Sequence, residues 1–307
     1  MIRYITQRAI HLLPILIGIS IVTFLMLHLI PGDPVLIFAG DKPLTEQRAA
    51  QLRHELGLDR PLWEQYATYV TRLARGDLGA GLHSNRPVLD SILEAAPATA
   101  ALTLSALAIA VVVGLGLGIL AALAHGSWLD TLTMTVAILG VSMPVFYLSL
   151  LMIIFFSFNL GWFPATGQGG LSHLVMPATA LGLLSSAVLA RLVRSNMLGV
   201  LREDYVQTAR AKGLPRAVVV LRHALKNALI PVLTVLGRQL GGLLSGAVVT
   251  ETIFSRAGLG RLAVNAILNR DYSLVQGTVL FSAVIYVLAN LLVDVAYAAV
   301  DPRIRYE

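Results

Sequence analysis

The chain has 307 residues and no cysteine, 56% of its residues are hydrophobic and 13% are charged, and its mean hydropathy is +0.76. A soluble domain of this length rarely has such a composition, so several membrane spans are predicted, and disulfides, thiolate metal sites and cysteine nucleophiles are excluded. The net charge of +6 does not indicate a nucleic-acid partner, because the basic residues lie mostly at the flanks of apolar stretches and are not interleaved with aromatic residues.

Apolar stretches bounded by charged residues, proline or glycine predict six spans. Because backbone groups in lipid find no water, each span should be helical, and the fold should be an all-α polytopic integral membrane protein. The first stretch follows Arg3 and Arg8 and is longer than a typical signal-peptide core, so it is predicted to be an uncleaved span. Pro144 and Pro177 should kink the third and fourth spans. The predicted spans are residues 10–30, 99–124, 132–158, 174–192, 228–249 and 276–299.

The segment after the first span, residues 31–97, carries balanced charges, as is typical of a translocated region. Apolar and aromatic residues recur at helical spacing after Pro61 and predict an amphipathic helix at the outer membrane interface. This helix either packs on the ends of the spans or docks an external partner. Its apolar face consists of Leu62, Trp63, Tyr66, Tyr69, Val70 and Leu73.

Two further features lie in the first two spans. His11 and His28 are predicted to be interfacial residues and not metal ligands, because no second ligand lies at binding spacing. Gly114, Gly116 and Gly118 have no polar residues beside them, so they predict a seam where a neighbouring helix packs closely.

Basic residues between the fourth and fifth spans predict the cytoplasmic side of the membrane. Six crossings then place both termini on that side, as expected of a multi-pass protein of the cytoplasmic (inner) membrane. Residues 1–98 form the first span and an extracytoplasmic segment, residues 99–299 a five-helix core, and residues 300–307 a cytoplasmic tail. The basic residues of the loop are Arg194, Arg202, Arg210, Lys212, Arg216, Arg222 and Lys226.

A short helix is predicted within this basic loop, at about residues 203–213. Acidic residues in its first turn and basic residues in its last turn suit the helix dipole, and Gly213 followed by Pro215 should end it. One face of small side chains beside one aromatic would let another protein approach the backbone. The helix is therefore either a socket for a partner or a solvated connector. The residues of that face are Tyr205, Thr208, Ala209 and Lys212.

The stretch from Asp204 to Leu214 resembles the EAA loop of binding-protein-dependent ABC importer permeases, in the form found in the dipeptide, oligopeptide, nickel and glutathione group. Gln207 and Thr208 stand where the name-giving glutamate and its following alanine occur in other permeases. Further motifs similar to that group cover nearly the whole chain in order. They are Pro31 to Pro34, Leu56 to Leu62, Gly76 to Gly79, Glu251 to Phe254, Gly258 to Gly260 and Asp301 to Tyr306.

The resemblance implies a type I ABC importer permease fold and a non-catalytic subunit that passes peptide-like solutes, such as dipeptides, oligopeptides, glutathione or a nickel chelate. It implies a second homologous permease subunit, two ATP-binding subunits and an extracytoplasmic solute-binding protein docked on residues 31–97 and 251–275. No cofactor is expected on this chain, because its lysines lie outside any P-loop, and ATP and magnesium would be held by the partners. The residues assigned to ATPase coupling are Glu203, Asp204, Tyr205, Gln207, Thr208, Ala209, Arg210, Ala211, Lys212 and Gly213.

The fifth predicted span carries an arginine near its middle, where an ionised side chain facing lipid costs several kcal/mol. This side chain should pair with a neighbouring subunit or helix end, or line the solute path. Small residues around it permit close helix contact. The residues assigned to the path or the subunit interface are Arg238, Gln239, Gly241, Gly242, Ser245 and Glu251.

Two other functions stay open. An ion-coupled secondary transporter would need carboxylates inside the membrane, and Asp294 is the one acid inside a predicted span. A structural membrane-assembly factor would show no ATPase stimulation by solute.

Overall fold

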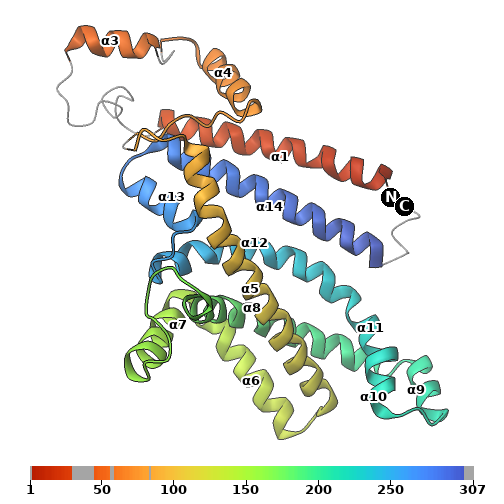
Figure 1. Ribbon diagram of the computed structural model, residues 1–307. Helices are drawn as coiled ribbons and strands as arrows, with labels where there is room; N and C mark the ends of the chain where they lie inside the picture. The colour runs from red at the N-terminus through yellow and green to blue at the C-terminus, as the bar shows by residue number, and fades with distance from the viewer. Residues whose placement is uncertain (1, 30–44, 56–58, 83, 301–307) are drawn as a thin grey trace. The chain divides into compact units, whose positions relative to one another are not determined.

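The computed structural model describes residues 2–29, 45–55, 59–82 and 84–300, and helices form nearly all of its regular structure (Figure 1). The all-α prediction is confirmed. In chain order the helices are α1 (Ile2–Leu29), α3 (Glu46–Glu55), α4 (Leu62–Ala74), α5 (Val88–Leu123), α6 (Trp128–Ser142), α7 (Val145–Met152), the π-helix η1 (Ile153–Asn159), α8 (Leu171–Val200), α9 (Asp204–Ala211), α10 (Arg216–Val218), the π-helix η2 (Val219–Ala224), α11 (Leu225–Ala228), α12 (Ile230–Ile253), α13 (Leu259–Leu268) and α14 (Tyr272–Val300).

Four helices, α5, α8, α12 and α14, are long and apolar enough to cross a membrane, and the bent pair of α6 with α7 and η1 makes a fifth span if it crosses as one. In α1 the apolar described stretch, Leu12–Met26, is shorter. The predicted number of six spans is therefore not confirmed by length and composition. The side chains of His11, His28 and Asp294 lie outside the described part of the chain.

A sharp break interrupts the predicted third span. The two halves, Trp128–Ser142 and Val145–Asn159, meet at 105°. Met143 has an extended backbone, with φ −87° and ψ 132°, because the ring of a following proline disfavours the helical conformation. The predicted kink at Pro144 is thus a full break, whereas α8 continues through Pro177.

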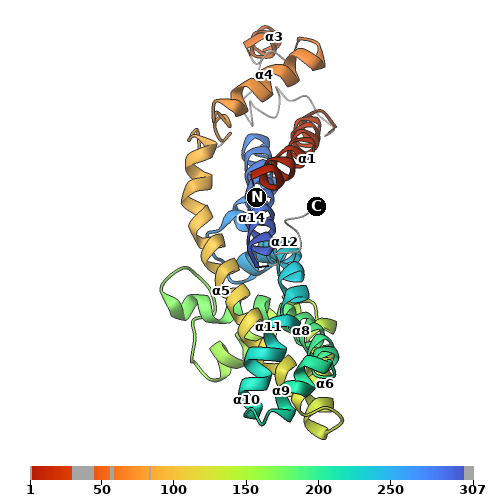
Figure 2. The same cartoon turned by 90° about the vertical axis from the view of Figure 1, so that its right-hand side faces the viewer.

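The contacts divide the chain into two units, which are described separately. Of the described residues, the first contains 98–261 and 288–300, and the second contains those from 2 to 97 and 262–287. In the first unit α8 is the central helix, since it contacts α6, α7, α11 and α12. In Figure 2, α9, α10 and α11 gather at the end of this unit where α5 ends and α6 begins.

Two glycines of α5 allow this helix to pack closely against α8. A Cβ added at Gly114 would lie 2.7 Å from Cβ of Leu189, and one added at Gly118 would lie 2.7 Å from the carbonyl oxygen of Ala190. Both distances are too short for a real Cβ. Gly116 meets nothing within 4 Å. The predicted seam is therefore correct for Gly114 and Gly118 and wrong for Gly116, which lies on another face of the helix.

An ion pair joins the start of α6 to α8. Arg194 donates from Nε to Oδ1 of Asp130 at 2.6 Å and from Nη2 to Oδ2 at 2.7 Å. Asp130 is buried, and its Oδ2 also accepts from the backbone N–H of Gly126 at 3.1 Å. This bidentate ion pair compensates the negative charge of Asp130, which would be costly to bury alone.

In the second unit, α4 packs on α1 through tyrosines. The hydroxyl of Tyr66 lies 2.8 Å from Oγ of Ser20, and that of Tyr69 lies 3.2 Å from Oγ1 of Thr23. The ring of Phe24 contacts both tyrosine rings. The amphipathic helix is confirmed, and this face of it packs on the first apolar helix. Leu62 and Trp63 are exposed, at 54% and 70%.

Replacing Gly118 with alanine should lower the free energy of unfolding by about 1–3 kcal/mol, because the methyl group collides with the backbone of α8. The matched variant Gly116→Ala should be neutral or stabilise by about 0.4–1 kcal/mol, because its space is open and the unfolded chain loses freedom. Thermal unfolding of the purified protein in detergent measures both. Equal losses in the two variants would contradict the packing described.

Candidate functional site

The predicted helix in the basic loop is confirmed as α9, Asp204–Ala211. It begins after Glu203, whose backbone is extended, and Asp204 lies in its first turn. After the C-cap residue Lys212, the chain turns away from the helix at Gly213, which has φ +76°. There the N–H of Gly213 donates to the carbonyl of Arg210 at 2.9 Å, and the N–H of Leu214 donates to that of Ala209 at 3.4 Å. This left-handed glycine stop is the one that the sequence pattern indicates.

Two residues of α9 face inward. Val206 and Ala209 are buried and pack with Val219 of η2. Ala209 was expected on the outer face, and that placement is wrong, because Val206 and Ala209 are three positions apart and form the apolar stripe that holds the helix to the chain. The other residues assigned to coupling are exposed. They are Glu203, Asp204, Tyr205, Gln207, Thr208, Arg210, Ala211, Lys212 and Gly213.

Side-chain hydrogen bonds fasten α9 at two points. Asn227 of α11 donates from Nδ2 to the hydroxyl of Tyr205 at 2.7 Å. Gln207 donates from Nε2 to the carbonyl of Leu201, at the end of α8, at 3.1 Å. Since α11 leads into α12 within two residues, α9 is tied directly to the ends of two long helices.

Exposed residues, most of them polar or small, form a stripe along α12. They follow one another three or four positions apart, which places them on one face of a helix. The opposite face, with Val232, Leu243 and Ala247, is buried. Among the described residues, no hydrogen bond or ion pair is found for the guanidinium of Arg238. We call this surface the α12 stripe; it consists of Thr234, Arg238, Gly242, Ser245, Val249 and Thr252.

The sequence assignments on α12 therefore separate into two groups. Arg238, Gly242 and Ser245 belong to the α12 stripe, and Gly241 is partly buried beside it. Gln239 turns toward α8 and donates from Nε2 to the carbonyl of Ser185 at 2.9 Å. Its Oε1 is buried and has no hydrogen-bond partner among the described residues. Gln239 thus contributes to packing within this chain.

Glu251 is the centre of a buried hydrogen-bond network and does not line a surface. Its side chain is 0% exposed. Oε1 accepts from Oγ1 of Thr99 at 2.6 Å, and Oε2 accepts from the N–H groups of Gly260 at 2.8 Å and Arg261 at 3.3 Å. Thr99 in turn accepts from the N–H of Leu259 at 2.8 Å. The carboxylate satisfies the free N–H groups at the start of α13, so its assignment to the path or interface is corrected.

Two glycines make room for this carboxylate. A Cβ at Gly258 would collide with the carboxylate of Glu251, and one at Gly260 would collide with the backbone of Val248. Close packing therefore requires glycine at both positions of the motif from Gly258 to Gly260. Thr99 was not singled out from the sequence, and no local pattern around it indicates a partner so far along the chain.

A buried arginine completes the turn between α12 and α13. Arg256 is 4% exposed and donates from Nη1 to the carbonyl of His173 at 3.1 Å. Burial lowers the pKa of its guanidinium, and the negative charge of Glu251 opposes that shift. The carboxylate and the guanidinium thus lie together in one desolvated region.

Comparisons with known proteins cover the whole chain. Residues 114–306 match the family described as "Binding-protein-dependent transport system inner membrane component", and residues 1–103 match its N-terminal counterpart. Three curated relatives align with this chain over 100% of both lengths. The dipeptide transport system permease protein DppB of Alkalihalophilus pseudofirmus is 43% identical, and the di/tripeptide transport system permease protein DppB of Pseudomonas aeruginosa is 44% identical. The glutathione transport system permease protein GsiC of Escherichia coli K12 is 42% identical.

Two solved structures share the fold. An inward-facing MetNI methionine ABC transporter matches with a TM-score of 0.60 at 18% identity, covering 69% of this chain and 96% of that one. An amino acid ABC transporter matches with a TM-score of 0.51 at 19% identity, covering 70% of this chain and 94% of that one. At these identities the likeness concerns the fold alone.

Replacing Thr99 with the similarly shaped valine should lower the free energy of unfolding, because the buried N–H of Leu259 loses its acceptor and Glu251 loses a donor. The cost of each unsatisfied buried group is about 1–3 kcal/mol. Thr99→Ser keeps the hydroxyl and should lose less. Thermal unfolding in detergent compares the two; a serine variant as unstable as the valine variant would rule out the hydroxyl as the cause.

Proposed function

Because the chain belongs to the family of inner membrane components of binding-protein-dependent transport systems, we infer that it is a permease subunit of an ATP-driven importer. Full-length similarity to dipeptide, di/tripeptide and glutathione permeases carries this conclusion and favours a peptide-like solute. The helical fold, with several helices able to span a membrane, agrees with it.

We propose the complete transporter to consist of this chain, a second homologous permease subunit, two ATP-binding subunits and an extracytoplasmic solute-binding protein. ATP and magnesium would be held by the ATP-binding subunits, since this chain has no P-loop sequence. The basic loop that contains α9 would face the cytoplasm, with both termini on the same side.

In this proposal α9 is the coupling helix, and its exposed side lodges in a groove of an ATP-binding subunit. The contacts that α9 makes with its neighbours support this role. Val206 and Ala209 fix α9 on η2, and Tyr205 is bonded to Asn227 just before α12. A displacement of α9 would therefore move the start of α12, instead of being absorbed by a loose loop. Closure of the ATPases could in this way change the arrangement of the spans.

The α12 stripe would line the solute path at the boundary with the second permease subunit. Its arginine cannot face hydrocarbon without a large cost, so water or protein must cover it. Gly242 and Ser245, exposed on the same face, leave space beside the helix for a solute. A cationic side chain in this position suits a solute that carries a carboxylate, as every unmodified peptide does.

Coupling to an ion gradient is less well supported than ATP-driven import. A cation-binding carboxylate must be free to exchange its ion, yet Glu251 is fully buried and bonded by Thr99, Gly260 and Arg261. Asp130 is likewise engaged by Arg194.

The coupling role can be tested by single cysteines, since the chain has none of its own. Thr208→Cys, on the exposed side of α9, should form a disulfide with a cysteine placed in the groove of the ATP-binding subunit. Ala209→Cys is the matched control, because this neighbouring side chain is only 6% exposed, and it should react poorly. Gel shifts of the assembled transporter measure both. Active uptake without any cross-link from Thr208→Cys would contradict the proposal.

Accessibility of α12 tests the path. Ser245→Cys should react with a membrane-impermeant thiol reagent in the assembled transporter, and bound solute should slow the reaction. Ala247→Cys lies on the buried face, at 1% exposure, and should stay unmodified. Mass spectrometry gives the extent of labelling. Labelling of Ala247→Cys in preference to Ser245→Cys would show that the α12 stripe does not meet the aqueous path.

A further inference from the structure

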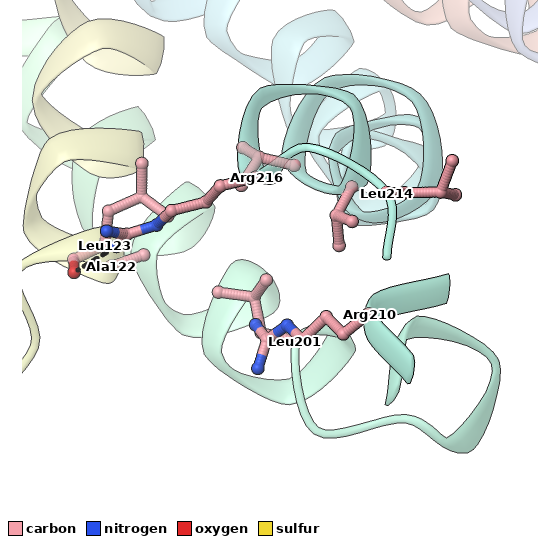
Figure 3. A pocket seen from close by; sticks show the side chains of 8 residues that line it. Ala122, Leu123, Leu201, Arg210, Leu214 and Arg216 are labelled. Carbon is pink, nitrogen blue, oxygen red and sulfur yellow. Dashed lines mark hydrogen bonds between the residues drawn. The ribbon is translucent and has the colours of Figure 1, made fainter. Parts of the chain in front are cut away.

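A cavity of about 420 Å³ lies beside α9, between the ends of several helices (Figure 3). Its volume falls within the about 300–1,000 Å³ usual for small-molecule sites. The lining comes from the ends of α5 and α8, from the last turn of α9 and the turn that follows it, and from the start of α10 and η2. These residues are Ala122, Leu123, Leu201, Arg210, Leu214, Arg216, Val219 and Val220.

The charge of the lining is entirely positive. Arg210 and Arg216 contribute the only ionisable side chains, and no acidic residue lines the cavity. Arg216 donates from Nη2 to the carbonyl of Leu123 at 3.4 Å, a long contact that leaves most of its N–H groups available. In the described part of the chain, no hydrogen bond or ion pair is found for the guanidinium of Arg210. In Figure 3 it extends back from α9 toward Leu201.

The rest of the lining is apolar. Ala122, Val219 and Val220 are buried, and three leucines complete the wall. Two guanidinium groups beside an apolar wall suit an anion that carries a hydrocarbon part. Each arginine can donate two hydrogen bonds to a phosphate, and the apolar wall can contact the hydrocarbon. Basic pockets at the cytoplasmic ends of spanning helices hold the head groups of anionic lipids.

We propose that this cavity binds the phosphate head group of an anionic phospholipid, held by Arg210 and Arg216, with the glycerol and upper acyl carbons against the leucine and valine wall. The placement at the inner leaflet rests on the orientation inferred under the proposed function. The chemistry of the cavity itself does not depend on it.

A lipid in this position would connect α9 to the spans. Arg210 belongs to the last turn of α9, and Arg216 to α10, whereas Ala122 and Leu123 end α5. A phosphate bridging the two arginines would hold the turn between α9 and α10 against the end of α5. Anionic lipid would thereby stiffen the connection through which the proposed coupling helix acts, and solute-stimulated ATPase activity should increase with the anionic lipid content of the bilayer.

The first test measures binding on the purified full-length chain. The delipidated protein is titrated with phosphatidylglycerol and, separately, with phosphatidylcholine and inorganic phosphate, and native mass spectrometry counts the bound molecules. Arg216→Gln should weaken phosphatidylglycerol binding roughly fivefold to tenfold, through loss of one charge-assisted contact. Arg222→Gln is the control, because this exposed arginine of η2 lies outside the cavity; it should bind as the native chain does.

Three outcomes overturn the proposal. The first is equal weakening by Arg216→Gln and Arg222→Gln, which indicates a diffuse charge effect. The second is inorganic phosphate bound as tightly as phosphatidylglycerol, which makes the cavity a site for a free anion. The third is unchanged phosphatidylglycerol binding by Arg216→Gln, which shows that this arginine does not hold the head group.

The second test uses the assembled transporter in lipid nanodiscs with and without phosphatidylglycerol. The native transporter should show higher solute-stimulated ATPase activity with the anionic lipid, and Arg216→Gln should lose that increase while keeping its activity in phosphatidylcholine. An equal increase in both would contradict the bridging role. Failure of the Thr208→Cys cross-link would overturn the coupling assignment and leave the binding measurement intact.

Discussion

The hydrocarbon of a membrane offers no hydrogen bonds, and this constraint governs the rest of the structure. Polar groups on the long helices must be satisfied within the protein or face water. Arg194 satisfies Asp130, and Thr99 with the first N–H groups of α13 satisfies Glu251. Arg238 has no such contact in the described part of the chain. The same rule that explains the internal networks thus identifies the α12 stripe as a surface that another molecule or water must cover.

The way in which α9 is attached to its neighbours supports a coupling role. A solvated connector would need neither a buried stripe nor side-chain bonds to its neighbours. In α9, Val206 and Ala209 are buried against η2, and the hydroxyl of Tyr205 accepts a hydrogen bond from Asn227 of α11, the short helix that precedes α12. The remaining residues of α9 are exposed. Such a helix can receive a force on one side and deliver it on the other, which is what an importer driven by separate ATPases requires.

Local sequence signals predicted the elements well. The bounds of α9 follow from acidic residues at its start and a glycine stop at its end, and both act within one turn. The apolar stretches predicted the long helices because their length is set by the bilayer. The sequence predicted less well which neighbour each helix face contacts. Ala209 was expected on an outer face and Gly116 in a packing seam, and the contacts that Gln239 and Glu251 make within the chain were not foreseen. A helical repeat shows which residues share a face and not which neighbour that face meets.

Composition and order of motifs by themselves determined the class of protein, its helical build, its family resemblance and the position of the short helix in the basic loop. The tertiary structure alone decided that Glu251 is an internal anchor, that the third predicted span is broken at Pro144, and that two arginines share one cavity. The reason is physical. Local backbone preferences and hydropathy act over a few residues, whereas Thr99 with Glu251, or Leu123 with Arg216, are brought together only when helices distant in sequence pack.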